Sequence, residues 1–283
     1  MRGHFPARDF ADMFGILEKT SNVKHARVHA EAKYVLQFDL KSAFPSVTAQ
    51  QLEKVLYALF WEQRDDLAAS YDFDNGNDDA IWTVVKKQWL VGKLTQIIVD
   101  LCTTKGILPQ GTPSAPFLFH LVIAHGLFDE LKNVCARLAG YHAKLTIYFD
   151  NIVISSSKPL PAIIRNQITD TILASGFEIN GRKTRSTSFR STAPLITGLR
   201  IVNGRVSLPR DTINKWRGLL HSAASDCKLW PEAQGILAYL LQVYGRRLDN
   251  YPGPLRQPIR EFKNVVRGSW LSGLEERDNT DPI

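Results

Sequence analysis

The chain has 283 residues, of which 44% are hydrophobic and 22% are charged, and its 35 Lys and Arg against 28 Asp and Glu give a formal net charge of +7. These proportions are typical of a globular protein and exclude intrinsic disorder, and the length allows one large domain or two modest ones. No apolar run reaches the roughly 20 residues of a transmembrane helix, which excludes a membrane-spanning protein. The moderate excess of base permits a polyanionic partner without requiring one.

The cysteines and the first residues of the sequence both bear on whether the protein is expected in a reducing or an oxidising compartment. The sequence has three cysteines, Cys102, Cys135 and Cys227, which is an odd number and shows no Cys-x-x-Cys spacing. Neither a disulfide framework nor a zinc site is therefore expected. The residues after Met1 carry charge without a following apolar stretch and do not resemble a secretion signal. We therefore expect a reducing, cytoplasmic environment and no membrane partner.

Hydrophobic periodicity predicts mostly helices in the first half of the chain. Apolar residues at helical spacing cover the stretches 10–19, 49–60, 82–102 and 117–138. A strand is predicted at 34–40, where strand formers alternate, and a Gly- and Pro-rich loop at 103–116. The acidic stretch 63–79 is predicted to be a solvated loop, because the Gly and Glu positions of a calcium-binding loop are not met.

The second half of the chain combines hairpins with helices. A hairpin is predicted over 144–155 with Asp150-Asn151 as its central turn pair, since both residue types tolerate a positive φ. A helix at 160–175 and a strand at 176–180 follow, and Asn203-Gly204 predicts a second hairpin over 195–206. The pattern from Asp211 onward is helical. The mixture predicts an α+β fold with antiparallel strands packed among helices.

Several common site motifs are missing from the sequence. His25 and His29 have the i, i+4 spacing of zinc ligands on a helix but lack the Glu of a zinc protease, so we expect two surface histidines. No Gly-rich phosphate loop and no nucleophile elbow occurs. The chemistry must therefore lie elsewhere.

Two acidic residues stand in apolar strand contexts. Asp39 follows Val-Leu-Gln-Phe at 35–38, and Asp150 follows Ile-Tyr-Phe at 147–149. A carboxylate in such a context is costly unless a cation offsets its charge. Each residue alone is equally compatible with a surface-facing turn, so the neighbouring motifs decide between the two interpretations.

Five short motifs follow one another along the chain. They read FDLKSAFPSV at 38–47, LPQGTPSAP at 108–116, YFDN at 148–151, GFEIN with KTR at 176–185, and TGL at 197–199. This ordered set resembles the reverse transcriptases, most closely the bacterial retron and group II intron-like branch, over about residues 34–270. The resemblance implies a right-hand polymerase fold with reduced fingers at 1–33, a palm at 34–207 that carries an acidic insertion at about 61–90, and a helical thumb at 208–283.

The resemblance also implies a catalytic centre for nucleotidyl transfer, which uses two divalent ions. Asp39 and Asp150 would be the catalytic ligands of two Mg²⁺ ions, with Mn²⁺ as an alternative, assisted by the Leu40 carbonyl and by Asn151. Lys183 matches the family lysine that protonates the leaving pyrophosphate, although a lone lysine is more often an ordinary surface residue.

Further residues are implied to bind the substrates. Phe44 matches the bulky residue that excludes a 2′-hydroxyl, although an ordinary core aromatic is the alternative interpretation. The other expected nucleotide contacts are Lys41, Gln110 and Gly111. The expected nucleic-acid contacts are Arg185, Gly198, Arg217, Arg246 and Arg247, which would hold phosphates and the primer.

The sequence departs from the family pattern in two ways. Asn151 stands where the family usually has a second Asp, which leaves the motif YFDN one charge short. The segment before Asp39 is short for a fingers region, and no motif match decides whether Lys24, Arg27, Lys33 or Lys41 replaces the family's triphosphate-binding bases. We therefore expect that another subunit (a second polymerase subunit or a second copy in a homo-oligomer) or an unusual template path completes the site.

The functional prediction is an RNA-directed DNA polymerase that uses an RNA template, a DNA or RNA primer and dNTPs. The resemblance implies a structured non-coding RNA partner and a role in bacterial antiviral defence. The alternative is a catalytically weakened palm that serves as a nucleic-acid-binding or scaffolding subunit, which Asn151 and the short N-terminus favour.

Overall fold

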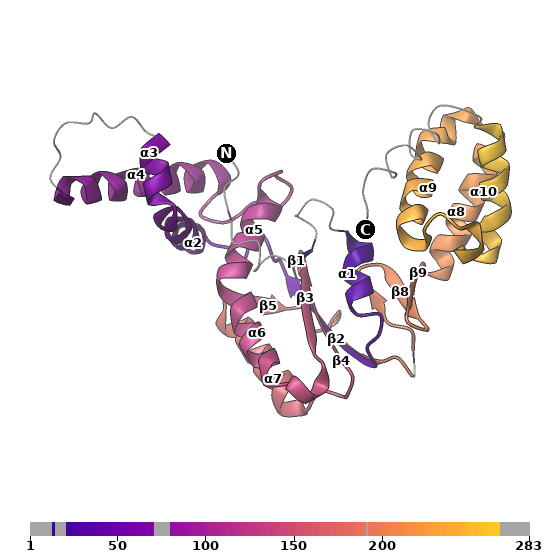
Figure 1. The fold of residues 1–283 in the computed structure, drawn as a ribbon, viewed down its shortest axis with the longest axis horizontal. Coiled ribbons are helices and arrows are strands. Elements are labelled where there is room, and N and C mark those ends of the chain that lie inside the picture. The colour runs from indigo at the N-terminus through magenta and orange to yellow at the C-terminus, as the bar shows by residue number, and fades with distance from the viewer. Residues whose placement is uncertain (1–12, 15–20, 71–79, 191, 267–283) are drawn as a thin grey trace. The chain divides into compact units, whose positions relative to one another are not determined.

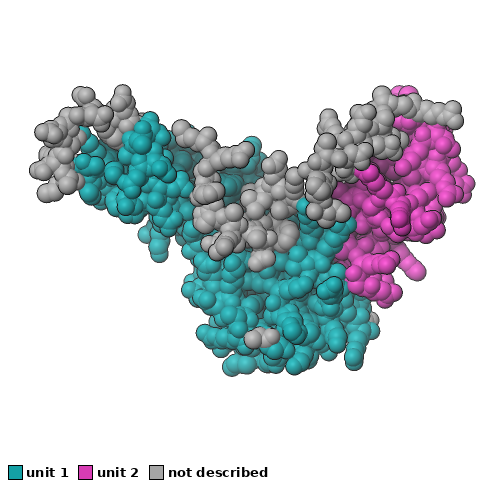
Figure 2. Space-filling view, viewed as in Figure 1, with its two compact units in different colours: residues 1–197 teal, residues 198–283 magenta. Residues whose placement is uncertain are grey.

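The computed structural model describes residues 13–14, 21–70, 80–190 and 192–266. The chain forms two compact units, residues 1–197 and residues 198–283, which Figure 2 draws in teal and magenta. The palm was predicted to end at 207, ten residues beyond the end of unit 1, so residues 198–206 of the second predicted hairpin fall in the C-terminal unit.

A six-stranded sheet forms the centre of unit 1. Its strands are β1 (Met13–Phe14), β2 (Tyr34–Lys41), β3 (Lys144–Tyr148), β4 (Asn151–Ser156), β5 (Glu178–Ile179) and β6 (Arg185–Ser188). Their order is β1-β3-β4-β2-β5, and β6 also pairs with β2. Strand β1 pairs parallel with β3, whereas β2, β3 and β4 form antiparallel pairs.

Helices surround this sheet. They are α1 (Asn22–Val28), α2 (Ala49–Glu62), α3 (Arg64–Ser70), α4 (Ala80–Cys102), α5 (Ala115–Ile123), α6 (Asp129–Ala136) and α7 (Ala162–Ala174), with a π-helical turn at Ala124–Phe128, a 3-10 turn at Ala139–Tyr141 and a short strand β7 (Leu195–Ile196) near the end of the unit. A capping box starts α2, because the Thr48 hydroxyl accepts from the Gln51 N–H and the Gln51 side chain accepts from the Thr48 N–H.

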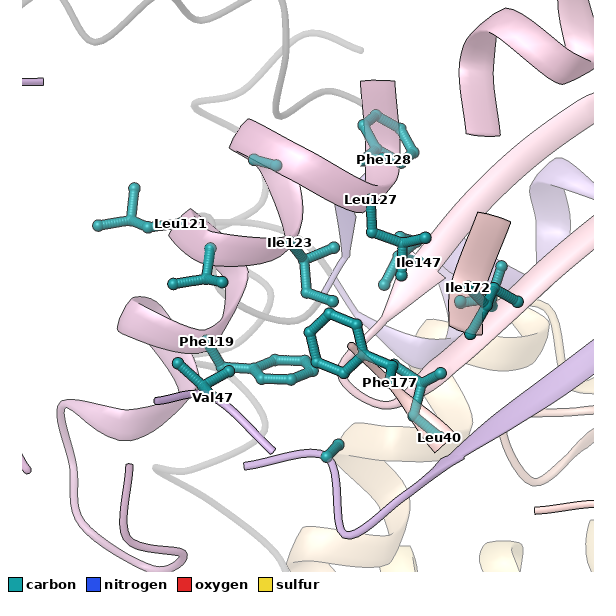
Figure 3. Packing of buried hydrophobic residues seen from close by; sticks show 14 of the residues in the cluster. Leu40, Val47, Phe119, Leu121, Ile123, Leu127, Phe128, Ile147, Ile172 and Phe177 are labelled. Atoms are coloured by element: carbon teal, nitrogen blue, oxygen red, sulfur yellow. The ribbon is translucent and has the colours of Figure 1, made fainter. Parts of the chain in front are cut away.

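Successive side chains along each strand point to opposite faces of the sheet. Figure 1 shows α6 and α7 on one side of the strands and α1 on the other. The first face is the apolar core, to which the central strands contribute Leu36, Phe38, Leu40, Leu145, Ile147, Ile152 and Ile154. Figure 3 shows how Phe119 of α5 and Phe177 meet beside Leu40 in this core.

The other face carries the residues between these apolar positions. Asp39, Thr146 and Asn151 alternate with core residues of β2, β3 and β4, so their side chains leave the sheet on the side of α1. Helix α1 contacts β3 there. These polar side chains are thereby kept away from the apolar core, while their strands contribute the neighbouring residues to it.

Unit 2 consists of a hairpin and a helical bundle. Its elements are β8 (Leu199–Val202), β9 (Arg205–Ser207), α8 (Arg210–Ala223), α9 (Trp230–Tyr244) and α10 (Gly253–Val265), with 3-10 turns at Cys227–Leu229 and Leu248–Asn250. The hairpin turn is Asn203-Gly204, with φ of 50° and 72°, as predicted. Tyr244 of α9 joins helix to hairpin, because its hydroxyl accepts from the Leu208 N–H at 2.9 Å.

Most predicted elements are confirmed within one to four residues, and the α+β fold class is confirmed. Over the described residues, no helix combines the length and the apolar character needed to cross a bilayer. Three predictions of local structure are wrong, each because a tertiary contact overrides a local pattern.

The first error concerns Met13–Phe14, which form strand β1 instead of part of a helix; the remainder of 10–19 lies outside the described residues. The edge of β3 pairs with this segment and satisfies its backbone. The second concerns the acidic stretch. Arg64–Ser70 form helix α3, which is joined to α4 by a Lys87–Asp65 ion pair at 2.7 Å, and 71–79 lie outside the described residues.

The third error is the turn of the hairpin over 144–155. Tyr148 pairs with Asn151, so the two turn residues are Phe149 and Asp150, and Asn151 begins strand β4. The bulky Phe149 takes the positive φ of 51° that the prediction had assigned to Asp or Asn. His120 packs against the Phe149 ring with 5.4 Å between ring centroids, and Tyr148 packs at 4.9 Å, so aromatic contacts support the strained turn.

Candidate catalytic site

The pairing of β2 with β4 brings the two predicted catalytic carboxylates into one place. Asp39 lies directly opposite Asn151 in the antiparallel register, and the Leu40 N–H donates to the Asp150 carbonyl at 2.9 Å. The Asp39 carbonyl accepts from the Asn180 N–H at 2.8 Å, which ties the residues after β5 to the same point. Backbone hydrogen bonds thus join residues 39 and 40 to residues 180 and 150, although these segments are far apart in the sequence.

The electrostatics show that the two carboxyl groups interact. Partial burial raises the pKa of Asp150, and the negative charge of Asp39 raises this pKa further. The Lys183 ammonium and a hydrogen bond from Asn151 oppose the rise. Asp39 is 9% exposed. Two carboxylates that are close together and partly desolvated form a site that attracts positive charge.

Lys183 supplies one positive charge at this site. Its Nζ lies 3.2 Å from Asp39 Oδ1, and the turn that carries it is closed by the Lys183 N–H donating to the Asn180 carbonyl. The lysine side chain is 63% exposed, so the pair adds little to stability and Lys183 can move away from Asp39 at low cost. The structure therefore places all three predicted catalytic side chains together.

Asn151 interacts with the neighbouring carboxylate through its amide nitrogen. The Nδ2 group donates to Asp150 Oδ1 at 2.9 Å. This hydrogen bond orients Asp150 and offsets part of its negative charge. The Asn151 side-chain oxygen, the atom that a cation would require, is not used in this bond.

The donor set fits Mg²⁺. Hard cations prefer oxygen ligands, and Mg²⁺ in nucleotide enzymes is commonly held by one or two carboxylates together with substrate phosphates. Asp39 and Asp150 provide two such carboxylates, and their mutual repulsion would be relieved by a cation. Across the described part of the chain, no group of three or more His, Cys, Asp or Glu is arranged to hold a metal ion.

Phe44 lies in the turn that follows β2, close to Asp39 in the chain. Its ring packs against Phe119 with 5.0 Å between centroids, and Phe119 packs against Phe177 at 6.1 Å. Phe44 is only partly buried, whereas Phe119 is fully buried. A rigid aromatic support therefore holds Phe44 at the edge of the core.

The loop with Gln110 and Gly111 is attached to the same turn. The Leu108 N–H donates to the Val47 carbonyl at 2.9 Å, and the Ala49 N–H donates to the Gly106 carbonyl at 2.8 Å. Gly111 has a φ of +95°, which a residue with a side chain adopts only under strain, and it is exposed. The sequence thus provides a loop whose backbone a ligand can approach closely.

The remaining predicted contact residues divide between the two units. Lys41 is exposed and paired with Glu178 at 2.8 Å, and Arg185 lies exposed on β6, opposite Gln37 of β2. Gly198, the first residue of unit 2, has a φ of +83°. In unit 2, Arg217 on α8 and Arg246 and Arg247 after α9 are exposed.

The prediction that His25 and His29 lie on the surface is wrong. Both are 0% exposed, and each directs its Nε2 at the hydroxyl of Thr146, at 2.7 and 2.6 Å. His29 Nδ1 is 2.7 Å from the Ser155 hydroxyl. The i, i+4 spacing correctly indicated a shared helix face, but the sheet covers that face. The rings can be buried there because the hydroxyls of Thr146 and Ser155 are hydrogen-bond partners for their nitrogens.

These histidines make stability depend on pH. Burial lowers the pKa of His29 to about 3, with Lys144 contributing, and lowers the pKa of His25 well below its usual value, with His29 contributing. Below pH 6.5 these histidines bind protons in the unfolded chain but not in the folded chain. Their contribution to the free energy of unfolding is therefore complete above pH 6.5 and is lost as the pH falls from there to about 3.

We expect the free energy of unfolding to fall between pH 7 and pH 5 by about 2 kcal/mol for His29, with a further loss in the same direction from His25. Urea denaturation at both pH values measures this loss. The variant His29→Gln, which cannot titrate, should have a smaller slope with pH than the unmodified chain. Equal slopes in the two proteins would contradict the assignment.

Comparison with known proteins identifies the family. The model described as "Reverse transcriptase (RNA-dependent DNA polymerase)" matches residues 1–201, well over half of the chain. The chain belongs to the reverse transcriptase family. The matched range contains Asp39, Asp150 and Lys183 and ends inside β8.

Curated relatives confirm the predicted resemblance to the retron branch. The chain is 24% identical over 255 residues to the retron Ec86 reverse transcriptase of Escherichia coli, covering 86% of this chain and 67% of the relative. It is 26% identical to the E. coli retron Ec73 enzyme, covering 72% and 60%, and 28% identical to the Myxococcus xanthus retron Mx65 enzyme, covering 70% and 43%. The chain thus spans between about two fifths and two thirds of the length of these relatives.

A solved structure of apo telomerase from Candida tropicalis is also similar in outline. It matches with a TM-score of 0.48 and 10% sequence identity, covering 92% of this chain and 46% of the telomerase chain. A score this low supports no inference about function.

Proposed function

We propose that this chain is an RNA-directed DNA polymerase that joins nucleotides by two-metal nucleotidyl transfer at Asp39 and Asp150. The observation that carries the proposal is the β2–β4 register, which sets Asp39 opposite Asn151 and next to Asp150 on the polar face of the sheet. Membership in the reverse transcriptase family and similarity to proteins named retron reverse transcriptases support it.

In this proposal each residue has a defined task. When bound, two divalent ions activate the primer 3′-hydroxyl and neutralise charge on the leaving pyrophosphate. Asp39 and Asp150 hold these ions, with the Leu40 carbonyl and the Asn151 side-chain oxygen as further ligands. Lys183 releases Asp39 and gives its Nζ proton to the departing pyrophosphate.

The substrate contacts in this proposal follow the same geometry. Phe44, held by Phe119, blocks the space of a 2′-hydroxyl and selects dNTPs. Gln110, the backbone at Gly111 and Lys41 contact the incoming nucleotide. The nucleic-acid contacts are Arg185, Gly198, Arg217, Arg246 and Arg247.

The wider functional setting extends the proposal. Residues 1–33 act as reduced fingers, 34–207 as the palm and 208–283 as the thumb. An RNA template, a primer, dNTPs, a structured non-coding RNA and a second subunit or second copy are the partners, and antiviral defence is the role. A reducing cytoplasm is the assumed compartment, in line with the free thiols of Cys102, Cys135 and Cys227.

The test is extension of a labelled DNA primer on an RNA template in the presence of Mg²⁺. We expect a product whose sequence copies the template, with dNTPs used in preference to NTPs and with no product in a chelator. Product that forms equally well without a template, or no product with either Mg²⁺ or Mn²⁺, would contradict the proposal.

A catalytically weakened subunit is the second candidate, because Asn151 lowers the negative charge at the site. The variant Asn151→Asp separates the two candidates. A weakened site should gain activity when the charge is restored, since affinity for the cation rises. A site adapted to the amide should lose activity, because the bond from Asn151 to Asp150 is replaced by repulsion between two carboxylates.

A further inference from the structure

Helix α1 holds the last residue of unit 1. Asn22 Nδ2 donates to the Thr197 carbonyl at 3.1 Å, and the Thr197 hydroxyl lies 3.4 Å from the Asn22 carbonyl. His25 Nδ1 lies 3.4 Å from the same hydroxyl. Asn22 and His25, one helical turn apart on α1, therefore both contact Thr197, which is 172 or more positions away in the chain.

The backbone at this residue requires support. Thr197 has a φ of 45° and Gly198 has a φ of 83°, and a β-branched residue at positive φ is strained. The boundary between the two compact units falls between these residues. Such a conformation persists only where surrounding contacts hold it, and α1 supplies contacts to both the carbonyl and the hydroxyl of Thr197.

The same helix is joined to the catalytic hairpin. His25 Nε2 lies 2.7 Å from the Thr146 hydroxyl on β3, and the His25 ring stacks on Tyr148 with 5.5 Å between centroids and 25° between planes. Tyr148 is the last residue of β3 and begins the YFDN motif, two positions before Asp150. One buried histidine thus contacts both the catalytic strand and the exit point of unit 1.

We propose that Asn22 and His25 are positioning residues that fix the backbone at Thr197, next to the proposed nucleic-acid contact Gly198, relative to the catalytic strand β3. This inference rests on the proposed polymerase function, in which unit 2 holds the primer. Loosening the anchor shortens the DNA made in one binding event, while the chemistry at Asp39 and Asp150 proceeds at its normal rate.

The test uses a pair of variants on the same helix end. Asn22→Asp removes the donor to the Thr197 carbonyl, and Asn22 is only half-buried, so the helix tolerates the change. Ser21→Asp is the control, because it adds the same charge one residue earlier and keeps a good N-cap side chain for the Lys24 N–H. A difference between the two variants therefore reports the lost hydrogen bond.

Two readouts are measured on the full chain. The first is hydrogen exchange of the backbone amides at 195–201, which should rise roughly fivefold in Asn22→Asp and stay unchanged in Ser21→Asp. The second is primer extension on an RNA template with a trap for released protein. The mean number of nucleotides added per binding event should fall roughly fivefold in Asn22→Asp, with the rate of the first addition within about twofold of the unmodified chain.

The outcomes separate this inference from the proposed function. Exchange at 195–201 that is the same in both variants overturns the anchor, whatever the activity. A first-addition rate that falls in step with product length also overturns it, because the change then acts on the chemistry. If the unmodified chain extends no primer, the proposed function fails, and the exchange measurement decides whether α1 anchors Thr197.

Discussion

Asp39→Asn and Asp150→Asn should each lower template-directed nucleotide incorporation by about a thousandfold, since each removes a ligand that contributes several kcal/mol to stabilising the transition state. The backbone bonds at this site, from the Leu40 N–H to Asp150 and from the Asn180 N–H to Asp39, do not depend on the side chains and should persist. Single-turnover primer extension on an RNA template measures the effect.

Folding and chemistry can be separated in this experiment. Because Asp39 raises the pKa of Asp150 by repulsion, loss of either charge relieves that repulsion, and we expect thermal unfolding midpoints no lower than that of the unmodified chain. The control Asp170→Asn makes the same chemical change on the exposed face of α7. Retention of full activity in either site variant, with the fold intact, would refute the assignment of the metal ligands.

Phe44→Val should reduce the preference for dNTPs over NTPs, measured as the ratio of kcat/KM values, by about ten- to a hundredfold. A steric contact in a pocket is worth about 1–3 kcal/mol of discrimination, and valine leaves space for a 2′-hydroxyl where the phenyl ring does not. Incorporation of dNTPs should change much less than incorporation of NTPs, because the smaller side chain removes an obstacle that only NTPs meet.

The matched control for this variant is Phe60→Val. Phe60 is a partly buried phenylalanine that packs on the same core, but it lies on α2. Both changes remove the same atoms from the same core, so both should lower stability to a similar extent. An equal change in sugar preference in both variants would mean that Phe44 acts through the core alone.

Local sequence patterns predicted much of the fold because the forces involved are local. The alternation at 34–40, the helical periodicity of α2, α4 and α7, and the Asn203-Gly204 turn follow from backbone preferences and from burial of one face. The resemblance of the ordered motifs to the reverse transcriptases singled out the carboxylates Asp39 and Asp150, since the apolar strand context of each was equally compatible with a surface-facing turn.

The register of the β3–β4 hairpin could not be predicted in this way. Asp150 and Asn151 both tolerate positive φ, so local preference placed the turn on them. The structure moves the turn to Phe149 and Asp150, because β4 must place Ile152 and Ile154 in the core and pair Asn151 with Asp39. A shift of one residue would direct these isoleucines to the polar face.

What the sequence by itself determined was therefore most of the helices and strands, the family motifs and the residues proposed for the site. Only the tertiary structure decided that His25 and His29 are buried against Thr146, that Lys183 lies on Asp39, and that α1 contacts Thr197. The physical reason is that each of these contacts joins residues more than a hundred positions apart. Their partners depend on strand pairing and packing, which no local pattern encodes.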